Sequence, residues 1–451
     1  MMKKKMKSTL KTVFLNLIAL TLLPLAQFTS AALPIQKIQL DSGATLFFVE
    51  ARTIPMINIG IDIKAGSVFD PKGKVGVADF AANLLNKGAL VQGVKKDEAY
   101  LSDKISDLGA VFKASVSNEL TSIRMKSLSK ATILDEVIAI SAEMIANPSF
   151  EQKVLSREKS LAVSGLLESQ TRPDYLMSEQ FTKMLYQGNP LGKMASVEDI
   201  KKIDVQDLRK FHQSYYRAKN TNVIIVGDVS TENAIQIANR LTQKMPKGPE
   251  LDMSVPTFKP LPVKPADVRE VHIPHPSTQA HIQMGIDSVP RNHPDYFPLL
   301  VGNYILGGGG FVSRLMNEIR EKRGLAYSVS SYFIPAKYSG FFSASMQTKK
   351  EQSAQAVQLL NQTIGEFAKS GPTDEEIIAA KSNLVNGFAL RIDSNNKLLE
   401  NVANIAWNDL PLNTLDTWTT QIQKVTKEDI QRVFKKYLDS DRMITVVVGG
   451  N

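Results

Sequence analysis

A chain of 451 residues is longer than one ordinary hydrophobic core supports, so two or three domains are expected. Hydrophobic residues make up 43% of the chain and charged residues 22%, which excludes an intrinsically disordered composition. The formal net charge is +9, and the complete lack of cysteine excludes disulfides and thiolate metal sites.

The N-terminus has the pattern of a secretory signal. Five lysines and no acidic residue lie among the first residues, an apolar run covers 12–26, and the small residues Ser30, Ala31 and Ala32 follow. The run is short for a membrane span of ~20 residues, so a cleaved signal over 1–32 is favoured over an uncleaved anchor. We therefore expect a periplasmic protein of net charge +4, with no stable membrane anchor. No arginine-rich stripe points to nucleic acid as a partner.

The predicted elements begin with a hairpin over Leu40–Phe48. Two neighbouring strands are predicted at Val111–Val116 and Thr121–Met125. Apolar residues at helical spacing predict helices at Val75–Asn86, Ala131–Ala146, Glu151–Ser169, Phe311–Lys322, Ser353–Ala368, Asp374–Arg391 and Leu399–Asn408. Runs of strands beside runs of helices indicate an α+β fold in which helices cover a mainly antiparallel sheet.

An internal repeat divides the chain into two related halves. Residues 200–228 and 422–450 align without a gap at an offset of 222, each with a capped helix, a buried strand and a glycine. The four prolines between Lys247 and Lys264 indicate an extended linker over 248–265. We therefore expect two homologous α/β-roll halves, at 33–247 and 266–451.

The segment Gly66–Gly88 (GSVFDPKGKVGVADFAANLLNKG) resembles the first active-site segment of the insulinase/pitrilysin-type zinc peptidases, including their processing-peptidase branch. In that family an inverted H-x-x-E-H motif on a helix supplies two zinc ligands and the Glu that activates the bound water. The framework of the motif is intact in this chain, at Gly76, Ala78, Phe80, Leu84, Leu85, Lys87 and Gly88.

The resemblance implies that the zinc ligands themselves are lost. Asp79 stands at the first His position, Ala82 at the Glu position and Asn83 at the second His position. The family's third ligand, a Glu seven residues after a position matched by Glu158, is replaced by Gly165. We expect no metal or other cofactor bound by this chain, because the remaining oxygen donors would make a poor zinc site.

The histidines offer no clear replacement site. His272 and His275 have H-x-x-H spacing, but residues three apart on a strand face opposite sides and Pro274 intervenes. His212 aligns with Phe434 in the repeat, which predicts a packing role.

The second half carries a better-preserved motif. Leu306–Val329 (LGGGGFVSRLMNEIREKRGLAYSV) resembles the second-domain motif of the same family. The resemblance implies that Arg320 and Tyr327 reach across a closed chamber, bind substrate and stabilise the oxyanion. The alternative is that R-G-L-A-Y only builds a helix–turn–strand corner. A substrate-binding loop is expected at Gly307, Gly308, Gly309 and Gly310.

Two-chain members of the family contain a zinc-bearing subunit and a second subunit without H-x-x-E-H. This chain resembles the second subunit. The resemblance predicts that the chain is the non-catalytic partner of a zinc-bearing homologue and that it binds peptide substrates. The strand Val111–Val116 is expected to align these peptides by strand addition. Two alternatives remain open at this point. One is a peptide-binding or scaffold protein without catalysis, and the other is an unconventional metallopeptidase that uses Asp79, Asn83 and Glu158.

Overall fold

The structure is a computed structural model that describes residues 34–247, 253–255 and 269–450. The predicted signal segment 1–32 and most of the predicted linker 248–265 lie outside the described residues. Within the described part of the chain, no helix is long and apolar enough to cross a bilayer.

The N-terminal half is built on a six-stranded sheet with strand order β1-β2-β8-β3-β7-β6. Every neighbouring pair is antiparallel except β2 and β8, which are parallel. The predicted strands at Val111–Val116 and Thr121–Met125 are confirmed as the antiparallel pair β6 and β7. The strands are β1 (Gln36–Gln39), β2 (Thr45–Glu50), β3 (Met56–Ile63), β6 (Val111–Val116), β7 (Thr121–Leu128) and β8 (Thr221–Gly227), with a separate hairpin of β4 (Gly88–Val91) and β5 (Val94–Asp97).

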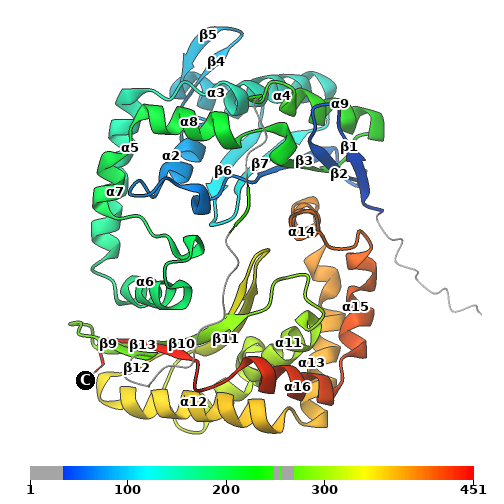
Figure 1. Cartoon of the computed structure of the whole chain (residues 1–451). Helices are drawn as coiled ribbons and strands as arrows, with labels where there is room; N and C mark the ends of the chain where they lie inside the picture. Colours follow the sequence, from blue (N-terminus) through cyan, green and yellow to red (C-terminus); the bar gives the residue numbers. More distant parts are fainter. Residues whose placement is uncertain (1–33, 248–252, 256–268, 451) are drawn as a thin grey trace, which may run out of the picture. The chain divides into compact units, whose positions relative to one another are not determined.

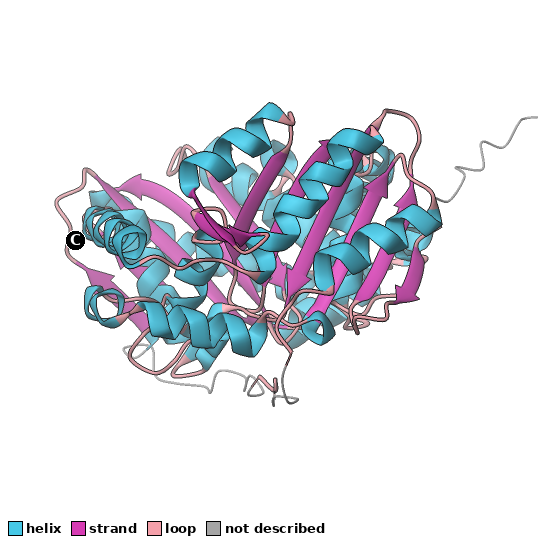
Figure 2. Cartoon of the chain, turned by 90° about the horizontal axis from the view of Figure 1, so that it is seen from above, coloured by secondary structure: helices cyan, strands magenta, loops and turns pink. Residues whose placement is uncertain are grey.

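The C-terminal half is built on a five-stranded sheet with strand order β11-β12-β10-β13-β9. It is antiparallel except for β13 and β9, so each of the two large sheets contains one parallel pair. The predicted α+β class with two mainly antiparallel, helix-covered halves is confirmed (Figure 2). The strands are β9 (Glu270–Ile273), β10 (Gln279–Ser288), β11 (Val329–Pro335), β12 (Gly340–Lys349) and β13 (Ile444–Val448).

The helices repeat between the halves at the spacing found in the sequence. Four pairs of helices begin 222 residues apart, so the repeat extends well beyond the segment in which it is readable. The pairs are α4 (Ala131–Ala146) with α12 (Ser353–Ser370), α5 (Gln152–Ser169) with α13 (Asp374–Asn386), α6 (Pro173–Tyr186) with α14 (Asn395–Trp407), and α8 (Val205–Tyr215) with α16 (Lys427–Tyr437). The other α-helices are α2 (Val77–Asn83), α3 (Glu98–Asp107), α7 (Val197–Lys202), α9 (Thr231–Thr242), α11 (Tyr296–Asn303) and α15 (Thr414–Lys424).

Each half lends one helix to the sheet of the other half. The helix α14 packs on β8 and β3, where Leu399 and Val402 join a buried cluster with Phe47 and Ile224 (Figure 1). The repeat-related helix α6 packs in the same way on β13 and β10. Burial of these apolar faces joins the two halves through two separate hydrophobic contacts.

Four predicted helices differ from the observed ones. The predicted helix Asp374–Arg391 is α13, which ends at Asn386 and is followed by a 3-10 turn, and the predicted helix Leu399–Asn408 is α14, which begins four residues earlier. The predicted helix Val75–Asn86 is the shorter α2, because Gly76 has a left-handed φ of 112° and the backbone helix can begin only after it. The predicted helix Phe311–Lys322 was wrong in type. Its last part is a π-helical turn, η6 (Met316–Glu321), in which the Lys322 amide bonds to the carbonyl of Asn317 five residues back.

Candidate functional site

The family's metal-binding position forms one wall of a cavity in the N-terminal half. The cavity has a volume of about 500 Å³ and lies between α2, α5 and the edge strand β6. Asp79 and Asn83 project from α2 toward it, whereas Ala82 is buried in its wall. The amide Nδ2 of Asn83 donates a hydrogen bond of 3.2 Å to Oε2 of Glu158 on α5. This hydrogen bond joins α2 to α5.

The Glu158 carboxylate forms ion pairs with basic neighbours. Nη2 of Arg157 lies 2.7 Å from its Oε1 and Nζ of Lys87 lies 3.5 Å from the same oxygen. Glu98 completes this cluster at 2.6 Å from Arg157 and 3.0 Å from Lys87. The hydrogen bond from Arg157 is the main reason why the pKa of Glu98 is lowered. Glu158 therefore serves an ion-pair network that fixes α5.

The donors around α2 do not fit a zinc ion. One carboxylate and one amide would be the only donors from α2, and Gly165 contributes no side chain to the exposed face of α5. A Cβ added at Gly165 would meet no atom within 4 Å, so the third ligand position is open space. In the described ranges no group of three or more His, Cys, Asp or Glu residues could hold a metal ion. Asp79, Asn83 and Glu158 thus lack the ligand set that an unconventional metallopeptidase needs.

Two aspartates, one on α2 and one hydrogen-bonded to its first turn, have raised pKa values. Desolvation raises the pKa of Asp79, which lines the cavity. Burial also raises the pKa of Asp70 to about 7, against the opposing effect of hydrogen bonds from the Gly76 and Ala78 amides, each 2.8 Å long. Asp70 thereby fixes the first turn of α2.

Arg320 and Tyr327, the predicted pair of the second half, lie side by side. Nη1 of Arg320 donates a hydrogen bond of 2.9 Å to the carbonyl oxygen of Tyr327, and its guanidinium lies 4.7 Å from the Tyr327 ring centroid. Phe311 covers the guanidinium at 4.8 Å from its own ring centroid. Sequence reasoning missed Phe311, although an aromatic directly after a glycine run is a usable signal. The Tyr327 side chain is 83% exposed, so it is available to another molecule.

The glycine run before this pair serves close packing at one end and an unusual turn at the other. A Cβ on Gly307 would lie 2.4 Å from Oγ of Ser331, whereas Gly310 has a left-handed φ of 64°. Gly307 and Gly308 belong to a π-helical turn, η4 (Tyr304–Gly308), and Gly309 has a negative φ. Gly310 is therefore the one glycine of the four whose backbone adopts the left-handed conformation.

The histidines are held apart by separate partners. His272 lies 2.7 Å from Glu270, whereas His275 lies 2.9 Å from the carbonyl oxygen of Thr171. His212 is buried, as its alignment with Phe434 predicts, and its Nε2 lies 2.7 Å from the Ile145 carbonyl oxygen.

Two family patterns match most of the described chain. The pattern described as insulinase (peptidase family M16) matches residues 47–197, and the pattern described as the peptidase M16 inactive domain matches residues 202–384. The chain belongs to peptidase family M16. This membership confirms the family resemblance seen in the sequence.

Individual M16 relatives cover nearly the whole chain. The protein named non-peptidase homolog YmxG from Helicobacter pylori is 27% identical over 451 residues, which is 99% of this chain and 98% of that protein. The beta subunit of the mitochondrial-processing peptidase of Lentinula edodes is 23% identical over 417 residues, covering 88% of this chain and 86% of that subunit. The crystal structure of a peptidase M16 inactive domain from Pseudomonas fluorescens superposes with a TM-score of 0.86 and 31% identity, covering 92% of this chain and 98% of that one.

Proposed function

We propose that this M16 chain is the non-catalytic subunit of a heterodimeric peptidase. It binds extended peptides and supplies Arg320 and Tyr327 to the zinc site of a homologous partner subunit. The observation that carries the proposal is a contrast between the two halves. The donors on α2 and α5 do not fit zinc, whereas Arg320 and Tyr327 are held together with the Tyr327 ring exposed.

The geometry of the pair suits a role in peptide hydrolysis by a partner. A guanidinium between two rings keeps its charge and its orientation, and an exposed phenol can donate to developing negative charge. We place peptide alignment at β6, because it is the edge strand of its sheet and lines the cavity beside Asp79. Zinc belongs to the partner in this proposal, and the chain itself needs no cofactor.

We place the mature protein in the periplasm, exported by the predicted cleavable signal over residues 1–32. The proline-rich segment 248–265 separates the proposed N-terminal domain, 33–247, from the proposed C-terminal domain, 266–451.

The second candidate function is a peptide-binding or scaffold protein without catalysis. It is favoured by one relative that covers the whole chain and carries the name non-peptidase homolog. Under this alternative, Arg320 and Tyr327 matter only for the corner between η6 and β11.

The test is hydrolysis of a quenched peptide library by the mature chain alone, and by the chain mixed with a zinc-bearing M16 homologue from the same source. We expect activity only in the mixture. Arg320→Ala or Tyr327→Phe should lower kcat by roughly 10²–10³, the usual cost of one oxyanion donor, while the complex still assembles.

The matched control is Arg323→Ala. Arg323 lies three residues from Arg320 and is exposed, and its ion pair among the described residues is with Glu318, at 2.8 Å. Activity with stoichiometric zinc in the chain alone would overturn the proposal. Absence of both complex and activity would favour the scaffold function.

A further inference from the structure

A second basic region lies away from Arg320, around the end of α8. A cavity of about 860 Å³ is lined there by five basic side chains and, among the described residues, by no Asp or Glu. An adjoining cavity of about 1080 Å³ shares Arg217, Pro246 and Lys247 with it. We call the two cavities together the basic trough, and its basic lining residues are Lys64, Lys95, Arg209, Arg217, Lys219, Lys244, Lys247 and Lys337.

The trough carries more positive charge than its own acids balance. Three of its cations have carboxylate partners, because Lys95 pairs with Glu151, Lys244 with Glu143 and Lys337 with Asp409. In contrast, three exposed cations make no ion pair with any residue that the structure describes, namely Arg209, Lys219 and Lys247.

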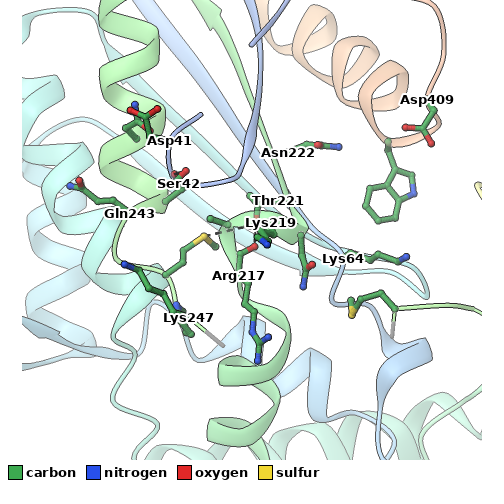
Figure 3. Close-up of a pocket in the computed structure, with 18 of the residues that line it drawn as sticks. Asp41, Ser42, Lys64, Arg217, Lys219, Thr221, Asn222, Gln243, Lys247 and Asp409 are labelled. Carbon is green, nitrogen blue, oxygen red and sulfur yellow. Dashed lines mark hydrogen bonds between the residues drawn. The ribbon is translucent and has the colours of Figure 1, made fainter. Parts of the chain in front are cut away.

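Three separate segments bring these cations to the walls of the two cavities, Arg209 to one, Lys219 to the other and Lys247 to both. Arg209 lies on α8, Lys219 on the short turn η3 (Ala218–Asn220) and Lys247 just after α9. In the view of Figure 3, Arg217 is drawn between Lys247 and Lys64, with Asp41 in the upper left part and Asp409 at the upper right. Cations inside a hollow act together, because the low-dielectric walls focus their field on whatever enters.

The remaining lining indicates the kind of anion. Leu90 offers exposed apolar surface, and several side-chain amides can bond to a peptide backbone, namely Asn147, Gln213, Asn220, Asn222 and Gln243. The aromatic rings in the lining, Phe150 and Trp407, are buried and offer no face on which bases could stack. A flat bilayer would not enter a hollow. This mixture of amide, aliphatic and cationic groups suits an extended acidic peptide.

We propose that the basic trough is a binding site for an extended acidic peptide segment, separate from the Arg320 and Tyr327 region. The ligand's carboxylates pair with Arg209, Lys219 and Lys247, and its backbone bonds to the amide side chains of the wall. This binding belongs to the chain alone and requires no zinc-bearing partner, so its test is independent of the proposed catalytic role.

The test is fluorescence anisotropy of a fluorescein-labelled octaglutamate peptide with the mature chain, with an octaglutamine peptide for comparison. We expect saturable binding of octaglutamate that weakens as salt is raised, and no saturable binding of octaglutamine. The combined variant Arg209→Glu, Lys219→Glu, Lys247→Glu should weaken binding by at least roughly tenfold. All three side chains are exposed, and thermal melting checks that the variant is folded.

The matched control has the same change in net charge on the other half, with Lys349→Glu, Lys369→Glu and Lys435→Glu, all at exposed positions. It should bind octaglutamate as the unaltered chain does. Equal weakening by both triple variants would overturn the site, because the attraction would then be a general charge effect. Tighter, trough-dependent binding of a single-stranded oligonucleotide or of phosphatidylglycerol vesicles would overturn the peptide assignment.

Discussion

The indole Nε1 of Trp407 donates a hydrogen bond of 2.9 Å to Oε2 of Glu119, although the two residues are 288 positions apart. Glu119 lies in the turn between β6 and β7 of the first half, and Trp407 ends α14 of the second half. The same carboxylate accepts from the backbone amides of Lys337 and Tyr338, in the turn between β11 and β12, at 3.1 to 3.2 Å. One buried side chain therefore joins three segments across the two halves.

We expect Glu119→Gln to loosen this junction. Glutamine keeps the size of the side chain, but its NH₂ group would face a donor where a carboxylate oxygen accepted. The free energy of unfolding should fall by about 1–3 kcal/mol, and tryptophan emission should shift as Trp407 loses its partner. Chemical denaturation followed by fluorescence measures both. Glu366→Gln, at an exposed position on α12, is the control and should change neither. Unaltered unfolding of Glu119→Gln would contradict the assigned role.

We expect that zinc binding can be restored by replacing the residues at the family's ligand positions. The combined variant Asp79→His, Ala82→Glu, Asn83→His, Gly165→Glu should bind about one zinc per chain, because the helix framework is intact and Gly165 faces open space. Zinc content after dialysis is the measurement. The same variant without Gly165→Glu should retain less metal, since it lacks the third ligand. A folded fourfold variant that retains no zinc would show that α2 and α5 no longer have the ligating geometry.

His212 should make stability depend on pH. Burial lowers its pKa to about 4 in the folded state, whereas an unfolded histidine titrates near about 6.5. The folded chain therefore binds fewer protons between these values, so the contribution of His212 is present above about pH 6.5 and is lost as the pH falls toward 4. This shift corresponds to about 3 kcal/mol.

The measurement is the free energy of unfolding of the unaltered chain and of His212→Phe, at intervals between pH 7 and pH 4. As the pH falls from 7 to 4, the free energy of unfolding of the unaltered chain should decrease by about 3 kcal/mol more than that of His212→Phe. Taking the difference removes the contribution of Asp70, whose raised pKa of about 7 acts in the opposite direction. A difference that stays constant with pH would refute the assignment to His212.

Gly307 should be intolerant of any side chain. Its added Cβ would lie 2.4 Å from Oγ and 2.6 Å from the backbone N of Ser331, so Gly307→Ala must displace β11. We expect a loss of about 1–3 kcal/mol, measured as a lower Tm. Gly365→Ala is the control, because nothing lies within 4 Å of its added Cβ inside α12, and it should stabilise the helix by about 0.5–1 kcal/mol. Equal effects at both glycines would argue against the close approach.

The sequence predicted much of the local structure because local signals were strong. The limits of α4 and the start of α12 follow from apolar periodicity, and α8 and α16 follow from their capping residues, with Asp204 and Thr426 each forming a capping box. The π-helical geometry of η6 could not be predicted, because apolar periodicity does not distinguish a π-helical turn from an α-helix.

The sequence alone determined that the chain contains an internal repeat and that Asp79, Ala82 and Asn83 stand at the H-x-x-E-H positions, and its family resemblance predicted the roles of Arg320 and Tyr327. These features reside in residue identity and spacing, which need no three-dimensional information. Only the tertiary structure decided that α6 and α14 exchange sheets, that Phe311 covers Arg320, that Glu119 meets Trp407, and that three unpaired cations share one trough. Most of these contacts join segments that are distant in the chain, and the others depend on how side chains pack in three dimensions. No local sequence pattern therefore specifies them.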